Sequence, residues 1–193
     1  DLVKPIESTM EPPYDATGFD PGPAWLDAPR DKAFYSFDNP YYALLDTGCH
    51  SVNLLRHLVG VTPTVTAAAN IGGVRLVQFD FDGVPGTMEF RLNFSMRKWD
   101  EVTELYFEKA TVVIKTPPPM DRQMTAEVEI YHENADLNQV TKLVDNRQWA
   151  FKRQTEAFLA SVRSGEPNAD GADAVNDLQV IEDIYKLESG AQS

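Results

Sequence analysis

Two segments that alternate apolar and polar side chains constrain the fold of this chain more than any other feature. Residues 74–81 read VRLVQFDF and residues 87–94 read TMEFRLNF, with Asp82-Gly83 between them. A period of two places apolar side chains on one face of a β-strand, and Asp-Gly is a favoured hairpin turn. The pattern therefore predicts an antiparallel hairpin with one covered face.

The hairpin belongs to a longer region of strands, residues 63–144. Three prolines at 117–119 predict a break or a sheet edge within it. Strand–helix–strand alternation is absent, so we expect antiparallel pairing. The segments expected as strands are residues 64–71, 74–81, 87–94, 104–107, 111–115 and 125–131.

Helical regions flank the strands on both sides. In residues 41–60, six aliphatic side chains fall within about 140° of one another at helical spacing, and a polar stripe lies opposite. Residues 147–189 predict two C-terminal helices that divide near Gly165. We therefore expect residues 1–193 to form a single α+β domain, an open, mostly antiparallel β-sheet with helices packed on one face. The polar stripe consists of Asp46, His50, Asn53 and His57.

Residues 1–40 form an acidic segment that is rich in proline and aromatic side chains. A loop of this length is usually functional or disordered, and its six aromatic residues favour a loop packed on the rest of the protein. We expect it to form one wall of a cleft.

The charge of the chain excludes several classes of function. Seventeen basic and 30 acidic residues give a net charge of −13, which disfavours binding to nucleic acid or to anionic membranes. No apolar run approaches the roughly 20 residues that a membrane span needs. Cys49 is the single cysteine, so neither an internal disulfide nor a cysteine zinc cluster can form. We expect a cytoplasmic protein without a metal site.

Motifs that bind nucleotides are missing from the sequence. It contains neither a G-x-G-x-x-G turn after a strand nor a phosphate loop with a lysine, and Gly72-Gly73 falls inside an expected hairpin. We therefore expect this chain alone to bind no nicotinamide cofactor.

The strongest chemical signal is the run Asp46-Thr47-Gly48-Cys49-His50. An aspartate and a histidine four residues apart are neighbours on a helix surface, so the carboxylate can orient the imidazole ring and favour its protonated form. The other ring nitrogen can then exchange a proton with a substrate hydroxyl. The alternative is an ordinary surface pair on an exposed helix face.

Several runs in order resemble the C-terminal domain of the Gfo/Idh/MocA oxidoreductases. Residues 43–60 resemble the signature helix of that family, and later runs resemble its sheet and closing helices. These runs are ALLDTGCHSVNLLRHLVG (43–60), PGTME (85–89), LYFEKAT (105–111), FLASVRSGEP (158–167) and DGADA (170–174).

The resemblance implies an architecture and an activity. Members of the family join a nicotinamide-binding Rossmann domain, which has no counterpart here, to an α+β domain like the C-terminal domain of glyceraldehyde-3-phosphate dehydrogenase. The second domain binds a sugar, an inositol or a related polyol. By residue match, His50 would transfer the proton, and Asp46 would be its partner or a ligand of a substrate hydroxyl. NAD or NADP would be the cofactor of the intact enzyme.

The implied partners are the substrate, the missing nucleotide-binding domain and further copies of the chain. Asn53 lies at a substrate-contacting position of the motif, Tyr42 would shape the pocket wall, and Trp25 or Tyr35 would stack on a sugar ring. Homo-oligomers would form through the sheet face, because Phe79, Phe81, Phe90, Leu92 and Phe94 are not expected all to point inward.

Two other interpretations remain open. The chain could be a stand-alone, non-catalytic relative that serves in assembly or carbohydrate binding. It could also be an unrelated acidic α+β interaction domain.

Overall fold

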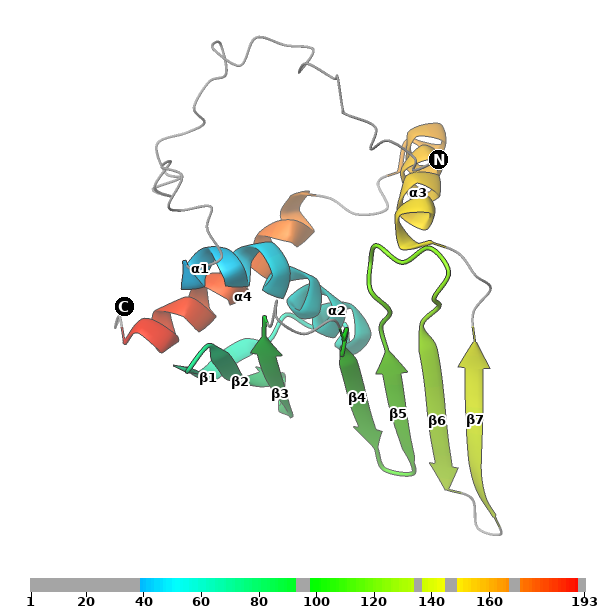
Figure 1. Cartoon of the computed structure of the whole chain (residues 1–193), viewed down its shortest axis with the longest axis horizontal. Coiled ribbons are helices and arrows are strands. Elements are labelled where there is room, and N and C mark those ends of the chain that lie inside the picture. The colour runs from blue at the N-terminus through cyan, green and yellow to red at the C-terminus, as the bar shows by residue number, and fades with distance from the viewer. Residues whose placement is uncertain (1–38, 93–97, 134–136, 145–148, 167–170, 191–193) are drawn as a thin grey trace, which may run out of the picture. The chain divides into compact units, whose positions relative to one another are not determined.

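The computed structural model describes residues 39–92, 98–133, 137–144, 149–166 and 171–190 (Figure 1). Where the sequence suggested a single domain, the chain divides into two compact units, Asp1–Ala43 and Leu44–Ser193. The boundary falls inside the helix expected over residues 41–60.

The described part of the first unit is a short capped helix, α1 (Pro40–Ala43). The side-chain oxygen of Asn39 accepts hydrogen bonds from the backbone N–H groups of Tyr41 (3.0 Å) and Tyr42 (3.4 Å). Asparagine is a favoured N-cap and proline a favoured first helical residue. Asn39-Pro40 therefore starts a helix as well as ending the proline-rich segment.

The second unit contains the predicted hairpin within a three-stranded antiparallel sheet. Its strands are β1 (Thr64–Ile71), β2 (Val74–Phe81) and β3 (Val84–Arg91), in that order. Asp82 and Gly83, both with positive φ, make the expected turn between β2 and β3. Because β3 pairs with β2 directly from this turn, it starts three residues earlier than the alternation indicated.

One face of this sheet is buried, and it contains aromatic residues that were expected to be exposed. Phe79 and Phe81 are 3% exposed and Phe90 is 9% exposed, so the aromatic residues expected on a free face lie in the core. Phe79 and Phe81 are two residues apart on β2, and Phe90 pairs with Arg75 of the same face, so the register turns all three inward. Leu92 is half-buried, and Phe94 lies outside the described residues.

Gly86 lets the ring of Phe81 lie against β3. A Cβ atom on Gly86 would come 2.6 Å from Cε2 of Phe81, which is closer than real contacts allow. The glycine in the middle of this strand therefore makes room for the aromatic core of the sheet.

Helices cover the buried face in two steps. Helix α4 (Gly171–Ser189) packs on β1, and α2 (Cys49–Val59) with the π-helical turn η2 (Leu44–Gly48) packs on α4. The predicted fold class, an α+β domain with an open antiparallel sheet, is confirmed (Figure 1). The most deeply buried side chains are Leu44, Val52, Val77, Val180, Ile181 and Ile184.

The remaining strands form a second sheet, where one sheet was expected. They are β4 (Val102–Phe107), β5 (Ala110–Lys115), β6 (Glu127–Glu133) and β7 (Asn138–Val144), an antiparallel meander in that order. Among the described residues no ladder joins β3 to β4. Alternation shows which residues form strands and which way they face, but not which strands pair. The three prolines at 117–119 fall between β5 and β6, as predicted.

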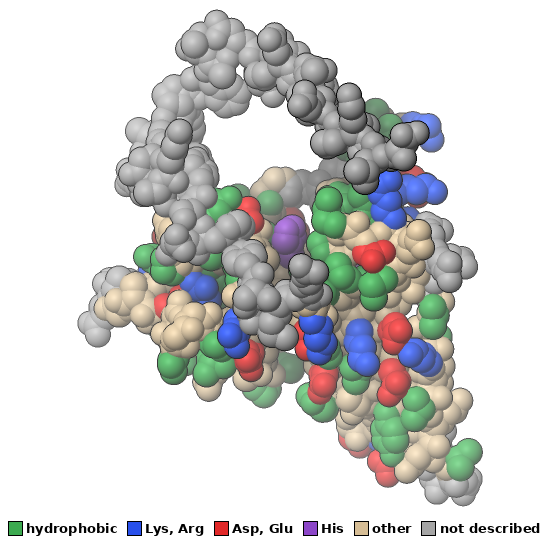
Figure 2. Space-filling model, in the orientation of Figure 1, with side chains coloured by type: hydrophobic (Ala, Val, Ile, Leu, Met, Phe, Trp, Pro, Cys, Tyr) green, Lys and Arg blue, Asp and Glu red, His purple; other side chains and the backbone are tan. Residues whose placement is uncertain are grey.

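The two faces of the β4–β7 sheet differ in charge. The register places Glu104, Lys115, Glu127, Glu129 and Lys142 on one face, where Lys142 and Glu127 form an ion pair of 2.8 Å. Figure 2 shows acidic and basic side chains interleaved over this sheet. The opposite face, called the apolar face below, carries no acidic residue, lysine or arginine. It consists of Thr103, Leu105, Phe107, Ala110, Val112, Ile114, Val128, Ile130, His132, Gln139, Thr141 and Leu143.

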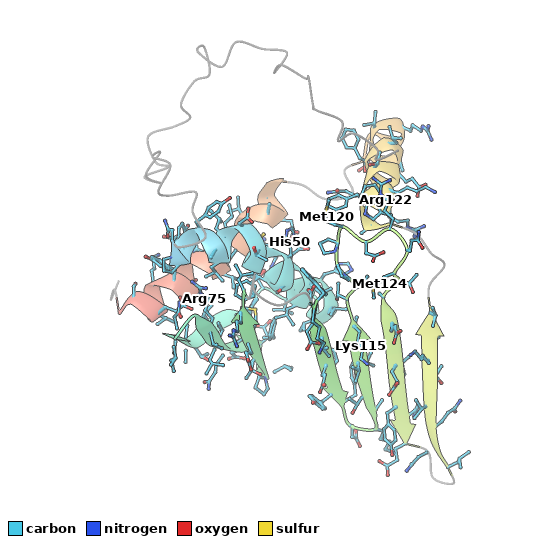
Figure 3. The ribbon with its side chains drawn as sticks, in the orientation of Figure 1. His50, Arg75, Lys115, Met120, Arg122 and Met124 are labelled. Atoms are coloured by element: carbon cyan, nitrogen blue, oxygen red, sulfur yellow. The ribbon has the colours of Figure 1, made fainter. Side chains whose placement is uncertain are left out.

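Helix α3 (Ala150–Ser164) has no buried residue. Just before it, the indole N–H of Trp149 donates to the carbonyl of Pro119 (3.0 Å), and the guanidinium of Arg122 lies 4.4 Å from the centre of its ring. Arg122 belongs to the β5–β6 connection, which Figure 3 shows with Met120 and Met124. None of the helices in the described part of the chain is long and apolar enough to cross a membrane.

Candidate functional site

The motif run Asp46-Thr47-Gly48-Cys49-His50 does not form a regular α-helix. Residues Leu44–Gly48 form a π-helical turn, and the α-helical geometry resumes at Cys49. Such turns occur mostly as single insertions in helices and frequently at functional sites. Sequence periodicity does not predict this turn, because over so short a length an α-helix and a π-helix bury nearly the same stripe of side chains.

Gly48 explains how the π-helical turn reaches the core. It is buried, and a Cβ atom there would lie 2.6 Å from Cδ1 of Leu44 and 3.9 Å from Cζ of Phe90. Leu44 is fully buried. Glycine at this position therefore lets the turn approach both Leu44 and the aromatic ring of β3.

The predicted polar stripe is exposed. Asp46, His50, Asn53 and His57 are all exposed, while Leu44, Gly48, Val52 and Arg56 form the buried stripe of the same helical segment. Figure 3 shows His50 on this segment. Because a π-helical turn holds more residues than an α-helical one, Asp46 and His50 do not have the spacing of a regular i, i+4 pair. The hydrogen bond between them remains a prediction.

Cys49 lies between the two candidate residues and is half-buried, with Sγ 3.6 Å from the carbonyl oxygen of Asp46. Burial raises the pKa of its thiol, and the negative charges of Asp46 and Asp177 raise it further. A thiol in this environment stays protonated at neutral pH and is a poor nucleophile.

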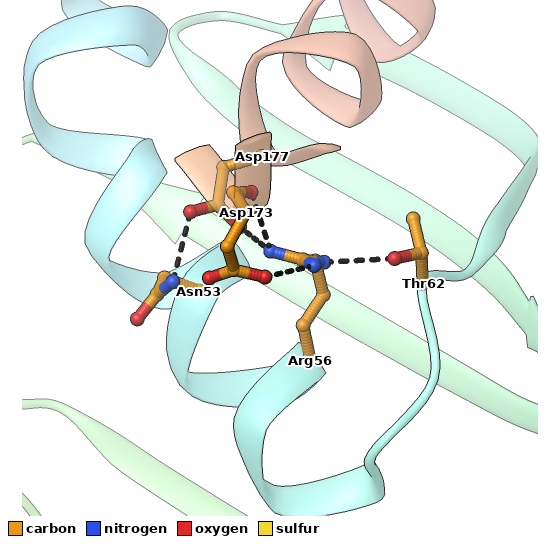
Figure 4. A network of polar contacts seen from close by, with 5 residues as sticks. All are labelled: Asn53, Arg56, Thr62, Asp173 and Asp177. Carbon is orange, nitrogen blue, oxygen red and sulfur yellow. Dashed lines mark hydrogen bonds and ion pairs between the residues drawn. The ribbon is translucent and has the colours of Figure 1, made fainter. Parts of the chain in front are cut away.

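Asn53 takes part in the contact between helices α2 and α4. Its side-chain N–H donates to Oδ2 of Asp177 (2.8 Å), beside a network centred on Arg56 (Figure 4). The structure thus gives Asn53 a partner within the protein, and its contact with a substrate remains a prediction.

Arg56 connects α2, α4 and the loop before β1. It is 9% exposed, and its guanidinium contacts Asp177 (2.5 Å), Asp173 (2.7 Å) and the hydroxyl of Thr62 (3.0 Å). Burial lowers the pKa of Arg56, but hydrogen bonds and charge interactions with Asp177 and Asp173 outweigh burial and raise it overall. The network fixes the helix that carries His50.

One carboxylate that interacts with His50 through charge was not predicted from the sequence. Glu101, the residue before β4, is half-buried. Burial raises the pKa of its carboxyl, while a hydrogen bond from the Trp99 side chain and the nearby His50 act in the opposite direction. No local pattern marks Glu101, because its relation to His50 spans about fifty residues of sequence.

The other predicted substrate residues lie elsewhere. Tyr42 is a half-buried residue of α1 in the first unit. Trp25 and Tyr35 lie outside the described residues, so their stacking on a sugar ring remains a prediction.

The described residues do not fit a dinucleotide cofactor. The glycines with positive φ lie in hairpin turns or at helix C-termini: Gly60, Gly72, Gly73, Gly83, Gly165 and Gly190. A pyrophosphate site needs a glycine turn between a strand and the N-terminus of a helix, and the described residues contain no such unit. They also contain no group of three or more metal-ligating side chains.

Comparison with known proteins reveals similarity of fold. No family model matches the chain, and no curated protein matches it in sequence. The solved structure of yvaA from Bacillus subtilis, which carries the name of an oxidoreductase, superposes with a TM-score of 0.60 at 10% identity over 78% of this chain and 51% of that one.

Two further structures have the same TM-score of 0.60. KijD10, a 3-ketoreductase from Actinomadura kijaniata in complex with TDP-benzene and NADP, is 15% identical over 75% of this chain and 46% of its own. A protein of Desulfitobacterium hafniense named as an NADPH-dependent oxidoreductase is 13% identical over 77% of this chain and 46% of its own. The chain thus shares the fold of part of these oxidoreductases and spans about half of their length.

Proposed function

We propose that this chain is the substrate-binding and oligomerisation domain of an NAD(P)-dependent sugar or polyol dehydrogenase. The observation that carries the proposal is the shared fold: three oxidoreductases contain it as about half of their chains, and one of them is a ketoreductase in complex with NADP. The exposed side chains of Asp46, on the π-helical turn, and His50, in the first turn of α2, are suited to proton transfer.

In this proposal the nicotinamide belongs to a separate nucleotide-binding domain, which supplies hydride transfer when the cofactor is bound. The residues of this chain bind and orient the substrate. His50 exchanges the proton of the reacting hydroxyl, and Asp46 orients the ring or holds a neighbouring hydroxyl. Tyr42, Asn53, Trp25 and Tyr35 are the proposed substrate contacts.

The first experiment uses the chain by itself. Calorimetric titration with a panel of sugars and inositols should detect binding of at least one class, and NADH or NADPH should not bind at micromolar affinity. His50→Ala should weaken the sugar binding, and His57→Ala is the matched control, an exposed histidine on the same helix. If both variants bind the sugar equally well, His50 is not part of the binding site.

The second experiment tests catalysis in an enzyme in which this domain is joined to a nicotinamide-binding domain. His50→Ala should lower turnover by about 10²–10⁴, the usual contribution of a general acid–base group. A wild-type enzyme that binds polyols but turns over none of them would favour the non-catalytic relative.

The oligomer is proposed to form through the apolar face of β4–β7. In a chain with a net charge of −13, a face without acidic residues is the one that two copies can share with least repulsion. From the strand spacing and the rise per residue, the apolar face has an area of roughly 400 Å² in each copy. The total area that two copies would bury therefore approaches the roughly 1,000 Å² of a specific interface. Val128→Lys should reduce the molar mass measured by light scattering, and a wild-type monomer at tens of micromolar would contradict the interface.

A further inference from the structure

Strand β7 forms one edge of the second sheet. It is the last strand in the order β4–β5–β6–β7, and all of its residues except the half-buried Thr141 are exposed. Within the described part of the chain, no backbone hydrogen bond lies on the outer side of this strand. An edge strand of this kind presents a row of unpaired N–H and C=O groups, to which another strand can add.

One hydrogen bond at the end of the β5–β6 ladder shows which backbone groups of β7 face outward. The N–H of Glu133 donates to the carbonyl of Lys109 (2.9 Å), so Glu133 directs its backbone groups toward β5. Its opposite residue on β7, Asn138, is then in a non-hydrogen-bonded pair, and such pairs alternate with hydrogen-bonded ones along an antiparallel ladder. The residues whose backbone groups face away from β6 are therefore Asn138, Val140, Lys142 and Val144.

The other three edges of the two sheets carry features that discourage strand addition. Strand β1 has an irregular register and lies against α4, β3 contains Pro85, and β4 carries the exposed carboxylate of Glu104. Proline, irregular register and charge are the usual protections of an edge. Strand β7 has no proline, glycine or acidic residue, and its single charge, on Lys142, is paired with Glu127 at 2.8 Å.

We propose that β7 pairs antiparallel with β7 of a second copy of this chain, so that two four-stranded sheets join into one sheet of eight strands. The strand is centred on Thr141. Pairing about this residue places Asn138 opposite Val144 of the partner subunit, and Val140 opposite Lys142 of the partner subunit. Every outward backbone group of β7 then has a partner, and the two Lys142 side chains do not lie directly opposite each other, which would be unfavourable.

Two observations favour a second copy as the occupant of this edge. The chain has a net charge of −13, and β7 offers two copies a strand without acidic residues. Edge pairing also turns the apolar faces of both copies to the same side of the joined sheet, where they form one surface of roughly 800 Å². Two such sheets stacked through this surface would bury roughly 1,600 Å², the usual size of a specific interface. The stacking rests on the proposed function, whereas the edge pairing does not.

The first test removes an outward N–H group from β7. Val140→Pro loses a donor of the new pair but none of the bonds between β6 and β7, and proline is tolerated on an edge strand. The molar mass measured by light scattering at tens of micromolar should fall to half of the wild-type value. Val140→Thr, which keeps the N–H, is the matched control and should leave the mass unchanged. Equal masses in all three proteins would overturn the edge pairing.

The same measurement on Val128→Lys separates this proposal from the interface through the apolar face. That variant should remain a dimer, because its edge is intact. A monomeric Val128→Lys protein together with an oligomeric wild type would overturn the edge pairing and leave the interface through the apolar face standing.

The second test is a cross-link in a Cys49→Ala background, which removes the single native cysteine. About the two-fold axis, Thr141 faces its own copy in a non-hydrogen-bonded pair with Cα atoms about 4.5 Å apart, which a disulfide can span. Thr141→Cys should therefore form a covalent dimer on oxidation. Gln139→Cys, on the same face of the same strand, should not, because the two copies of residue 139 lie about 14 Å apart.

Addition of Val140→Pro to the Thr141→Cys protein should abolish the cross-link. A cross-link that persists in this combined variant would place Thr141 in an interface between sheet faces and would overturn the edge pairing. Cross-linking of both cysteine variants, or of neither, would also overturn it.

Discussion

Replacement of Asp177 by asparagine tests how strongly α4 holds the helix that carries His50. Arg56 and Asp177 are 9% and 12% exposed at their side chains and lie 2.5 Å apart. Removal of one partner from a buried ion pair costs about 3–5 kcal/mol. In Asp177→Asn the amide oxygen still accepts a hydrogen bond, and Asp173 (2.7 Å) and Thr62 (3.0 Å) remain. We therefore expect a loss of about 2–3 kcal/mol in the free energy of unfolding.

Asp173→Asn is the matched control for this experiment. It removes the same charge from the same guanidinium, but the Asp173 side chain is 51% exposed, so water compensates and the expected loss is about 0.5–1 kcal/mol. Urea unfolding followed by circular dichroism measures both variants, and Asp177→Asn should also lower Tm by about 5–10 °C. Losses within about 0.5 kcal/mol of each other would show that burial does not set the strength of this network.

Two further predictions concern the core. Gly48→Ala should destabilise the protein by about 1–2 kcal/mol in urea unfolding, because overpacking against the fully buried Leu44 exceeds the gain in helix propensity; Gly171→Ala, where a Cβ atom meets nothing within 4 Å, should not destabilise it. Burial raises the pKa of the Glu188 carboxyl in the folded protein despite its ion pair with Arg75. The stability that this carboxyl contributes is therefore greatest below its pKa in the unfolded chain, near 4.5, and is lost as the pH rises through its pKa in the folded protein. The stability of the wild type relative to Glu188→Gln should therefore fall as the pH rises above about 4.5, and a difference that stays constant with pH would contradict a raised pKa.

Local patterns in the sequence predicted the secondary structure well where one period dominates. The alternation in residues 74–81 and the Asp82-Gly83 turn correspond to β2 and its hairpin, and Gly60 ends α2 with a φ of 80°. The direction of the aromatic residues was predicted incorrectly. Phe79, Phe81 and Phe90 were counted among the residues of a free sheet face, but the register places them on the buried face, under the helices.

The candidate site was only partly predictable, because its decisive contacts are long-range. Periodicity places His50 on the exposed side of a helix, but it does not reveal the π-helical turn that contains Asp46. The sequence analysis did not single out Arg56, since its acidic partners lie 117 and 121 residues away. Glu101 gave no signal for the same reason.

The contacts of α4 also determine when this chain can fold. Asn53, Arg56 and Arg75 find their partners 113 to 124 residues later, whereas each strand of the β4–β7 meander pairs with its neighbour in sequence. At a synthesis rate of about 5–20 residues per second, the partners of Arg56 emerge roughly 6–24 s after it. During translation the meander can form first, while the three-stranded sheet waits with its aromatic face uncovered. This interval is when we expect the nascent chain to depend most on chaperones.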